Sequence, residues 1–199
     1  LDVLGIHLGI AKHIQEEYDF KISAIVEINK GKKFYEQQKI VNFEKTWFFR
    51  DYIKNTSKFP DLNYLKNFEE KYKINLWKLV QNERIFLYFK NFYKFTSDEV
   101  LNILEQECRF FERVLDEVNP DFLIIKATDF HRSHLLEQMC RSKGIKILML
   151  ETSRLGYRSV ISEESNEIDY LESMRTTDNE ITFSELRNNL KKFDRYEQA

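Results

Sequence analysis

Two short apolar runs in the second half of the chain flank an amphipathic segment. The runs are residues 121–126 (DFLIIK) and 145–150 (IKILML), and the segment between them ends at Gly144. Two buried strands joined by a helix form a right-handed crossover, in which the strands are parallel neighbours. Ligands of such sheets bind beyond the carboxyl ends of the strands. The pattern therefore predicts a functional site where these two strands end.

A similar alternation of elements opens the chain. It predicts the end of a strand at 1–4, followed by a turn between Gly5 and Gly9 and a helix that runs to about Tyr18. A strand at 21–28, a helix at 32–38 and a short apolar run at 39–43 complete a further strand–helix–strand unit. Together with the crossover, this order predicts that residues 1–162 form an α/β domain. We expect a Rossmann-like parallel sheet flanked by helices.

Aromatic side chains interleaved with lysines dominate residues 44–95. Leu62, Leu65, Phe68 and Tyr72 follow helical spacing after Pro60, and residues 76–89 predict a second helix. We interpret the segment as a helical insertion that covers the carboxyl edge of the sheet and shapes an acceptor pocket. Basic residues with interleaved aromatics also suit single-stranded nucleic acid or sugars, whereas helical spacing is typical of a core with a solvated face.

The remainder of the chain predicts a long helix and then a polar end. Thr96 and Glu99 have the spacing of a capping box, and a one-sided apolar stripe follows as far as Val118. We expect three acidic side chains of this helix to face water: Glu105, Glu112 and Asp116. Residues 159–162 predict a short edge strand. Residues 163–199 form a polar segment with a last helix at 182–193, which we expect to lead toward a second domain.

Composition limits the choice of partners and compartment. The net charge of -2 argues against a protein that wraps DNA, because phosphate binding needs a basic excess. We expect Cys108 and Cys140 to be buried thiols, as in a reducing compartment. There is no apolar run of membrane-spanning length and no signal peptide, which favours a cytoplasmic protein. Because residue 1 is Leu, we expect the chain to be a piece of something longer or one trimmed at its start.

The loop after the first strand of the crossover offers an anion site. Asp129 is a candidate N-cap of the helix at 131–142, and Arg132 lies at the rim of its buried face. A cation beside free helix amides suits a phosphate or carboxylate. The alternative is an ion pair between Arg132 and Asp129 or Glu151. His131 lies on the flank of the helix, and nothing supplies the partners that a zinc site would need.

The loop after the second strand begins with a carboxylate. Glu151 is placed to act as a general base or to hold sugar hydroxyls, and Thr152 follows it. Arg154 and Arg158 could clamp an anionic group. The alternative is a salt-bridged Glu151 with solvated arginines. His7, in the first predicted helix, is either packed under the sheet edge or faces a ligand.

The run PDFLIIKATDFHRSHLLEQMCRSKGIKILMLETSRLGYRSVIS resembles the last crossover of the N-terminal domain of GT-B-type glycosyltransferases. It is most similar to the surface and capsular polysaccharide branch, and GIHLGIA is similar to the segment that opens such a domain. The resemblance implies the acceptor-side half of a metal-independent enzyme. A nucleotide-sugar donor would be gripped by a second Rossmann-like half, and a lipid-linked glycan acceptor would bring the enzyme to the inner face of the membrane.

The resemblance also implies roles for particular residues. It puts His7, Asp129 and Glu151 in the interdomain cleft as candidates for the catalytic base. The side chains expected to bind substrate come from the two loops of the crossover: His131, Arg132, Thr152, Arg154 and Arg158.

Two other classes of function fit the same sequence. One is a non-catalytic α/β binding or regulatory module, similar in architecture to flavodoxin-like receivers. A receiver needs an acidic cluster after its first strand, and Asp2 is the one candidate in this chain. The other is a single-stranded nucleic-acid binder that uses the aromatic–lysine segment.

Overall fold

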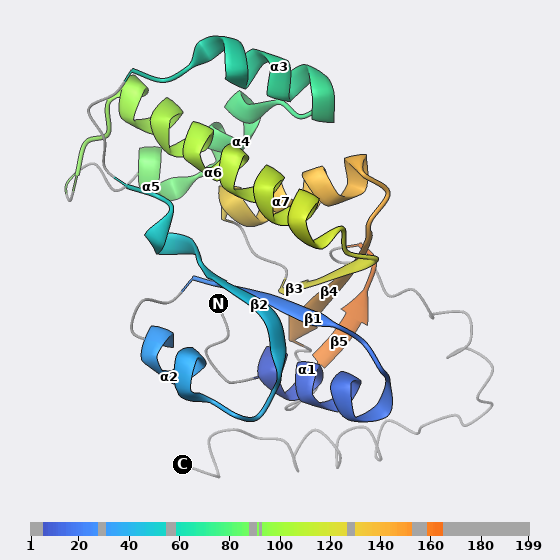
Figure 1. Ribbon diagram of the computed structural model, residues 1–199. Coiled ribbons are helices and arrows are strands. Elements are labelled where there is room, and N and C mark those ends of the chain that lie inside the picture. Colours follow the sequence, from blue (N-terminus) through green and yellow to red (C-terminus); the bar gives the residue numbers. More distant parts are fainter. Residues whose placement is uncertain are drawn as a thin grey trace, which may run out of the picture.

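The protein has an α/β fold in which short parallel strands lie between two groups of helices (Figure 1). The structure, a computed structural model, describes residues 6–27, 31–54, 59–87, 91, 93–126, 130–152 and 159–164. The strand predicted at 1–4 and the helix predicted at 182–193 lie outside these residues. Helices α3 to α7 lie on one side of the strands in Figure 1, and α1 and α2 lie on the other.

The first sheet comes from the opening of the chain. Helix α1 (Ile6–Glu17), strand β1 (Ile22–Val26), helix α2 (Lys32–Gln37) and strand β2 (Phe43–Phe48) follow one another, and β1 pairs with β2 in parallel. Strand β2 begins where the predicted apolar run at 39–43 ends. The reason is Gln38, whose side chain accepts from the amides of Ile40 and Val41 and donates to the Val41 carbonyl. These bonds hold residues 38–41 in a turn, so the strand starts later.

The second sheet contains the predicted crossover. Strand β3 (Phe122–Lys126), helix α7 (His131–Ser142) and strand β4 (Lys146–Thr152) form it, and β3 pairs with β4 in parallel. Strand β5 (Ser159–Ser162) adds to the other side of β4 in the antiparallel direction, as an edge strand. Gly144 follows α7 with a φ of 71°, a conformation that glycine adopts without steric cost.

The two sheets run in the same direction. At the amino end of β1, the ring of Phe20 packs against that of Phe122, with centroids 5.8 Å apart. At the carboxyl end of β1, Glu27 binds Arg132, which lies in the first turn of α7, the helix that follows β3. Since like ends meet at both places, β1 and β3 are parallel. The carboxyl ends of the strands therefore share one edge of the molecule.

Helix α6 (Ser97–Val118) is the spine of the helical layer. Its N-terminus has the predicted capping box, in which Thr96 and Glu99 bond reciprocally. The predicted stripe faces the core, with Leu104, Cys108 and Phe111 at most 2% exposed. The cores of the insertion and of the crossover form one cluster, because this helix contacts both.

The insertion packs on the other helices of the helical layer. Helix α3 (Leu62–Tyr72) contacts α6 and α7, and helix α4 (Leu76–Asn82) contacts α7, followed by the single turn α5 (Arg84–Leu87). The segment 44–95 is not wholly helical, because its first residues belong to β2 and to the 3₁₀ turn η2 (Phe49–Asp51). That the segment covers the carboxyl edge of the sheet stays a prediction.

Two acidic residues of α6 that were expected to face water do not. Glu112 accepts hydrogen bonds from the hydroxyls of Tyr64 and Tyr72 and from Lys71, all on α3. Glu105 pairs with Arg109 and accepts the amide of Asp61. Periodicity places both on the polar face of α6, but that face is the one on which α3 packs. Asp116 is exposed as predicted.

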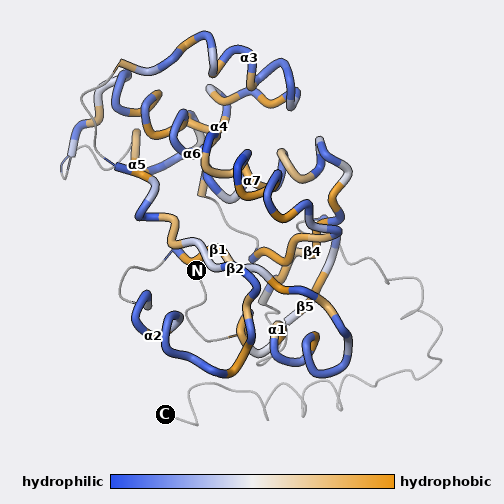
Figure 2. The backbone as a smooth tube through the Cα atoms, viewed as in Figure 1, coloured by the Kyte–Doolittle hydropathy of each residue, from blue (hydrophilic) through white to orange (hydrophobic). Residues whose placement is uncertain are grey.

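Both cysteines are buried free thiols, as predicted. Burial raises the pKa of Cys108 well above that of an ordinary thiol and raises the pKa of Cys140 to about 12. Neither thiol is therefore activated as a nucleophile. Figure 2 shows hydrophobic residues along β4 and mainly hydrophilic ones along α2. Within the described part of the chain, no helix combines the length and apolar character that crossing a membrane requires.

Two glycines should respond to alanine with opposite signs. A Cβ at Gly9, inside α1, or at Gly144 would meet nothing within 4 Å, but Gly144 alone has a positive φ. Gly9→Ala should therefore stabilise the fold by about 0.5–1 kcal/mol. Gly144→Ala should destabilise it by about 1–2 kcal/mol. Urea unfolding of the two variants measures both, and a shift of the same sign would contradict the assigned backbone conformations.

Candidate functional site

A buried histidine held by two carboxylates lies at the start of α7. Nδ1 of His131 is 2.7 Å from Oε2 of Glu83, and Nε2 is 2.8 Å from Oε2 of Glu107. Glu83 lies between α4 and α5, and Glu107 lies on α6, so the histidine joins the insertion, the spine helix and the crossover. All three residues are at most 5% exposed. We call this group the Glu83–His131–Glu107 cluster.

Glu83 explains why the predicted helix at 76–89 is broken. The residue has extended backbone, with a ψ of 111°, and its side chain turns inward. One carboxylate oxygen accepts the amide of Ile85 in α5, and the other accepts the amide of His131 in α7. The carboxylate thus satisfies free amides at two helix starts, where negative charge is favoured. These bonds are absent from an uninterrupted helix.

Neighbouring charges favour the ionised forms of His131 and Glu83. Burial alone would lower the pKa of His131, but the charge and hydrogen bond of Glu107, together with those of Glu83, raise it to about 9. Burial would likewise raise the pKa of Glu83, but the bonds from His131 and Ile85 lower it to about 2. Both ring nitrogens therefore donate, and one imidazolium faces two carboxylates. The ring of Phe86 covers the histidine, with centroids 5.0 Å apart.

Arg132, the next residue, faces the sheet. Its Nε and Nη2 donate to the two oxygens of Glu27 at 2.9 and 3.0 Å, a bidentate geometry that fixes the guanidinium plane. Its Cζ also lies 4.7 Å from the ring centroid of Phe130. Burial would lower the pKa of Arg132, but the hydrogen bond and charge of Glu27 raise it. The sequence suggested Asp129 or Glu151 as ion-pair partners of Arg132, and the partner shown among the described residues is Glu27.

The predicted site residues divide into three groups. His131 and Arg132 lie together at the start of α7. Glu151 and Thr152 end β4, and Glu151 is half-buried. Asp129, Arg154 and Arg158 lie outside the described residues, and the N-cap position predicted for Asp129 is occupied by Phe130.

His7 lies in the first turn of α1. The far end of that helix is held at the amino edge of the sheet, because Gln15 exchanges two hydrogen bonds with the backbone of Asn42, just before β2. A helix of 12 residues is about as long as these strands, since it rises roughly 1.5 Å per residue. The structure thus places His7 at the end of α1 opposite to the one that Gln15 anchors.

The placement of His131 differs from its predicted role. The sequence placed it on the flank of the helix as a substrate-binding side chain, but it is 5% exposed and both nitrogens bind carboxylates. Its observed role is to hold three elements together. Periodicity within one helix could not reveal this, because the carboxylates that cover the flank come from distant segments.

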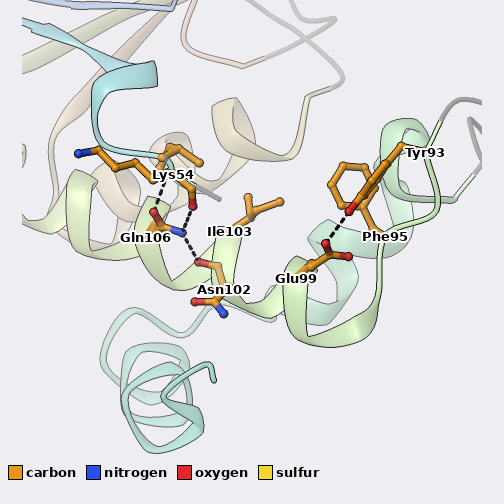
Figure 3. Close-up of a pocket in the computed structure, with 8 residues that line it drawn as sticks. Lys54, Tyr93, Phe95, Glu99, Asn102, Ile103 and Gln106 are labelled. Carbon is orange, nitrogen blue, oxygen red and sulfur yellow. Dashed lines mark hydrogen bonds between the residues drawn. The ribbon is translucent and has the colours of Figure 1, made fainter. Parts of the chain in front are cut away.

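A hollow of about 280 Å³ lies elsewhere, beside the N-terminal half of α6 (Figure 3). Its polar groups bind one another. Gln106 exchanges two hydrogen bonds with the backbone of Lys54 and donates to the carbonyl of Asn102, and Glu99 accepts from Tyr93 while it caps α6. Because the hydrogen bonds shown here join residues of the lining to one another, we base no functional site on this hollow.

Comparison of the chain with protein-family models, with curated proteins and with solved structures found no match. The candidate site therefore rests on the chemistry of its own residues. Among the described residues, His, Cys, Asp and Glu form no group of three or more placed to hold a metal ion.

Sequence reasoning missed Glu27, Glu83 and Glu107. A signal exists for Glu27, because it directly follows an apolar strand, as Glu151 does. Glu107 also falls among the core positions of α6, between Leu104 and Cys108. A charged residue at a core position indicates a buried partner of opposite charge. No local sequence signal distinguishes Glu83 from the other polar residues of the predicted helix.

The cluster should make the free energy of unfolding fall as the pH becomes alkaline. His131 has a folded pKa of about 9, above its ordinary 6.5, so its contribution is complete below pH 6.5 and is lost as the pH rises through 9. His131→Gln should abolish this loss and lower the free energy of unfolding at pH 6 by about 3–5 kcal/mol, because two buried carboxylates lose their cation.

Urea unfolding between pH 6 and pH 9.5 measures the effect. His134→Gln is the matched control, because His134 lies on the same helix and its side chain is 44% exposed. The control should keep the alkaline decline of the original protein. An equal decline in the His131→Gln variant would show that another group causes it.

Proposed function

We propose that the chain is the acceptor-side domain of a GT-B-type glycosyltransferase that builds cell-surface polysaccharide. The observation that supports this best is the Arg132–Glu27 ion pair, which joins the carboxyl end of β1 to the start of the helix after β3. Ligands of parallel α/β sheets bind at that edge. The resemblance of the crossover sequence to this branch of glycosyltransferases gives the edge its proposed chemistry.

The proposal gives the residues of the carboxyl edge separate tasks. In glycosyl transfer, an acceptor hydroxyl oxygen bonds to the anomeric carbon of the donor while the bond from that carbon to the nucleoside diphosphate breaks. Glu151 would take the hydroxyl proton, as a carboxylate at a strand end can. His7, in the first turn of α1, is the second candidate base. Arg132 would bind an anionic group of a substrate from the orientation that Glu27 gives it.

The proposal requires a partner domain for the donor. The nucleotide-sugar would be held mainly by a second Rossmann-like domain, and this chain would supply the acceptor wall of the cleft. Arg154, Arg158, Thr152 and Asp129 keep their proposed places in that wall on the strength of the resemblance alone. A lipid-linked acceptor would bring the enzyme to the inner membrane face.

A non-catalytic binding module is the alternative that the same edge supports. The nucleic-acid alternative has less support, because Phe68, Tyr72 and Phe86 of the aromatic segment pack in the core. Among the described residues of the insertion, the exposed rings are Phe59, Trp77 and Tyr93, at 86%, 58% and 46%. These rings belong to separate segments and give little surface for stacking successive bases.

Transfer of labelled sugar tests the proposal. The full-length protein should move label from a nucleotide-sugar to a capsular oligosaccharide when a panel of both is supplied. Glu151→Gln should lower kcat about 10²- to 10⁴-fold, because the proton acceptor is lost. Arg132→Lys should mainly raise KM, because a bidentate guanidinium contact is lost.

Glu16→Gln is the matched control, since Glu16 is an exposed carboxylate on α1 that pairs with Lys12. Its transfer rate should equal that of the original protein. If no pair of donor and acceptor gives transfer, but an oligosaccharide still binds, the binding-module alternative replaces the enzyme. Unchanged transfer by Glu151→Gln would exclude Glu151 as the base.

A further inference from the structure

Two adjacent residues at the start of α7 face different layers, and each has charged partners there. His131 binds Glu83 and Glu107 in the helical layer, and Arg132 binds Glu27 at the sheet edge. Consecutive residues on a helix are about 100° apart, so one turn of α7 bridges the two layers. Any shift of the histidine would move the arginine with it.

Compared with apolar packing, a buried charged group such as the Glu83–His131–Glu107 cluster adds little net stability. Removing three charged groups from water costs several kcal/mol for each ion, and well-packed apolar residues of similar volume are often as stable or more stable. What charged hydrogen bonds supply instead is a defined geometry. Each ring nitrogen of His131 has one acceptor, and Glu83 also binds the His131 amide. The ring and the backbone of this residue are therefore fixed together.

The cluster also acts on Arg132 through its charge. Two carboxylates around one imidazolium leave an excess of one negative charge. After burial and Glu27, the charges of Glu107 and Glu83 further raise the pKa of Arg132. The charged form of the guanidinium is thus stabilised by carboxylates of both layers. Geometry and charge act in the same direction.

We propose that Glu83 and Glu107 are positioning residues that, through His131, hold the Arg132 guanidinium at the carboxyl end of β1. This inference rests on the proposed function in one respect, namely that this edge is where substrate binds. Glu83 would then be the means by which the helical insertion influences the site, although the insertion packs on helices. Its role is indirect, because its carboxylate binds residues of α5 and α7 and acts on Arg132 through His131.

Exchange of the Arg132 Nε proton with water tests the positioning without any substrate. The NMR signal of this proton is identified by its loss in Arg132→Lys. In the original protein, exchange should be slow, because Nε donates to Glu27. Glu83→Gln should accelerate it about tenfold, whereas Glu112→Gln should change it by less than about twofold.

Glu112→Gln is the matched control because Glu112 is also a part-buried carboxylate that fastens the insertion to α6. It accepts three side-chain bonds from α3, none of them from α7. Both variants should lose stability, but the positioning role requires that Glu83→Gln alone releases Arg132. Equal exchange rates in the two variants would overturn it.

A second measurement decides the matter if Glu83→Gln does not fold. In the original protein, the Cζ chemical shift of Arg132 should move as His131 titrates near pH 9, and this movement should be absent from His131→Gln. Among the described residues, the charged groups bonded to the pair are Glu83, Glu107 and Glu27. A constant Cζ shift during the histidine titration would overturn the inference. Neither readout involves sugar transfer, so failure of the enzyme proposal leaves the positioning result interpretable.

Discussion

One imidazolium between two buried carboxylates is the constraint on which the described arrangement depends. His131, Glu83 and Glu107 come from segments that are distant in sequence, and they meet where α7 begins. No member can be buried alone as an ion, because desolvation would neutralise it or expel it. The insertion, the spine helix and the crossover must therefore be in place together. This makes the contact cooperative, in contrast to the exposed ion pairs on the surface, each of which contributes little.

The fold follows from this meeting of layers. Helix α6 presents an apolar stripe to the core, while Glu107 lies within that apolar surface and Glu112 receives α3 on the other side. The strands are short, and their common direction depends on contacts at both ends of β1 rather than on one continuous ladder. The carboxyl edge is thus assembled by side chains, which is why a change in the helical layer can reach it.

The crossover was predictable because its signals are local. The apolar runs, Gly144 and the Thr96–Glu99 capping box each act within a few residues, and strands, helix and cap are found where those signals place them. The candidate site was less predictable. Its edge and Arg132 were expected, but Glu27, Glu83 and Glu107 acquire their roles from tertiary contacts. The break at Glu83 shows this best, since its cause is a pair of helix starts in other segments.

The two contacts that join the ends of β1 to β3 and α7 differ in their chemistry. At the amino edge, Phe20 and Phe122 meet through an apolar contact, which dissolved salt hardly weakens. At the carboxyl edge, Glu27 and Arg132 meet through charge, and both side chains are partly accessible to ions. Raising the ionic strength therefore loosens one edge more than the other. The edge whose contact depends on ionic strength is therefore the one that carries the candidate site.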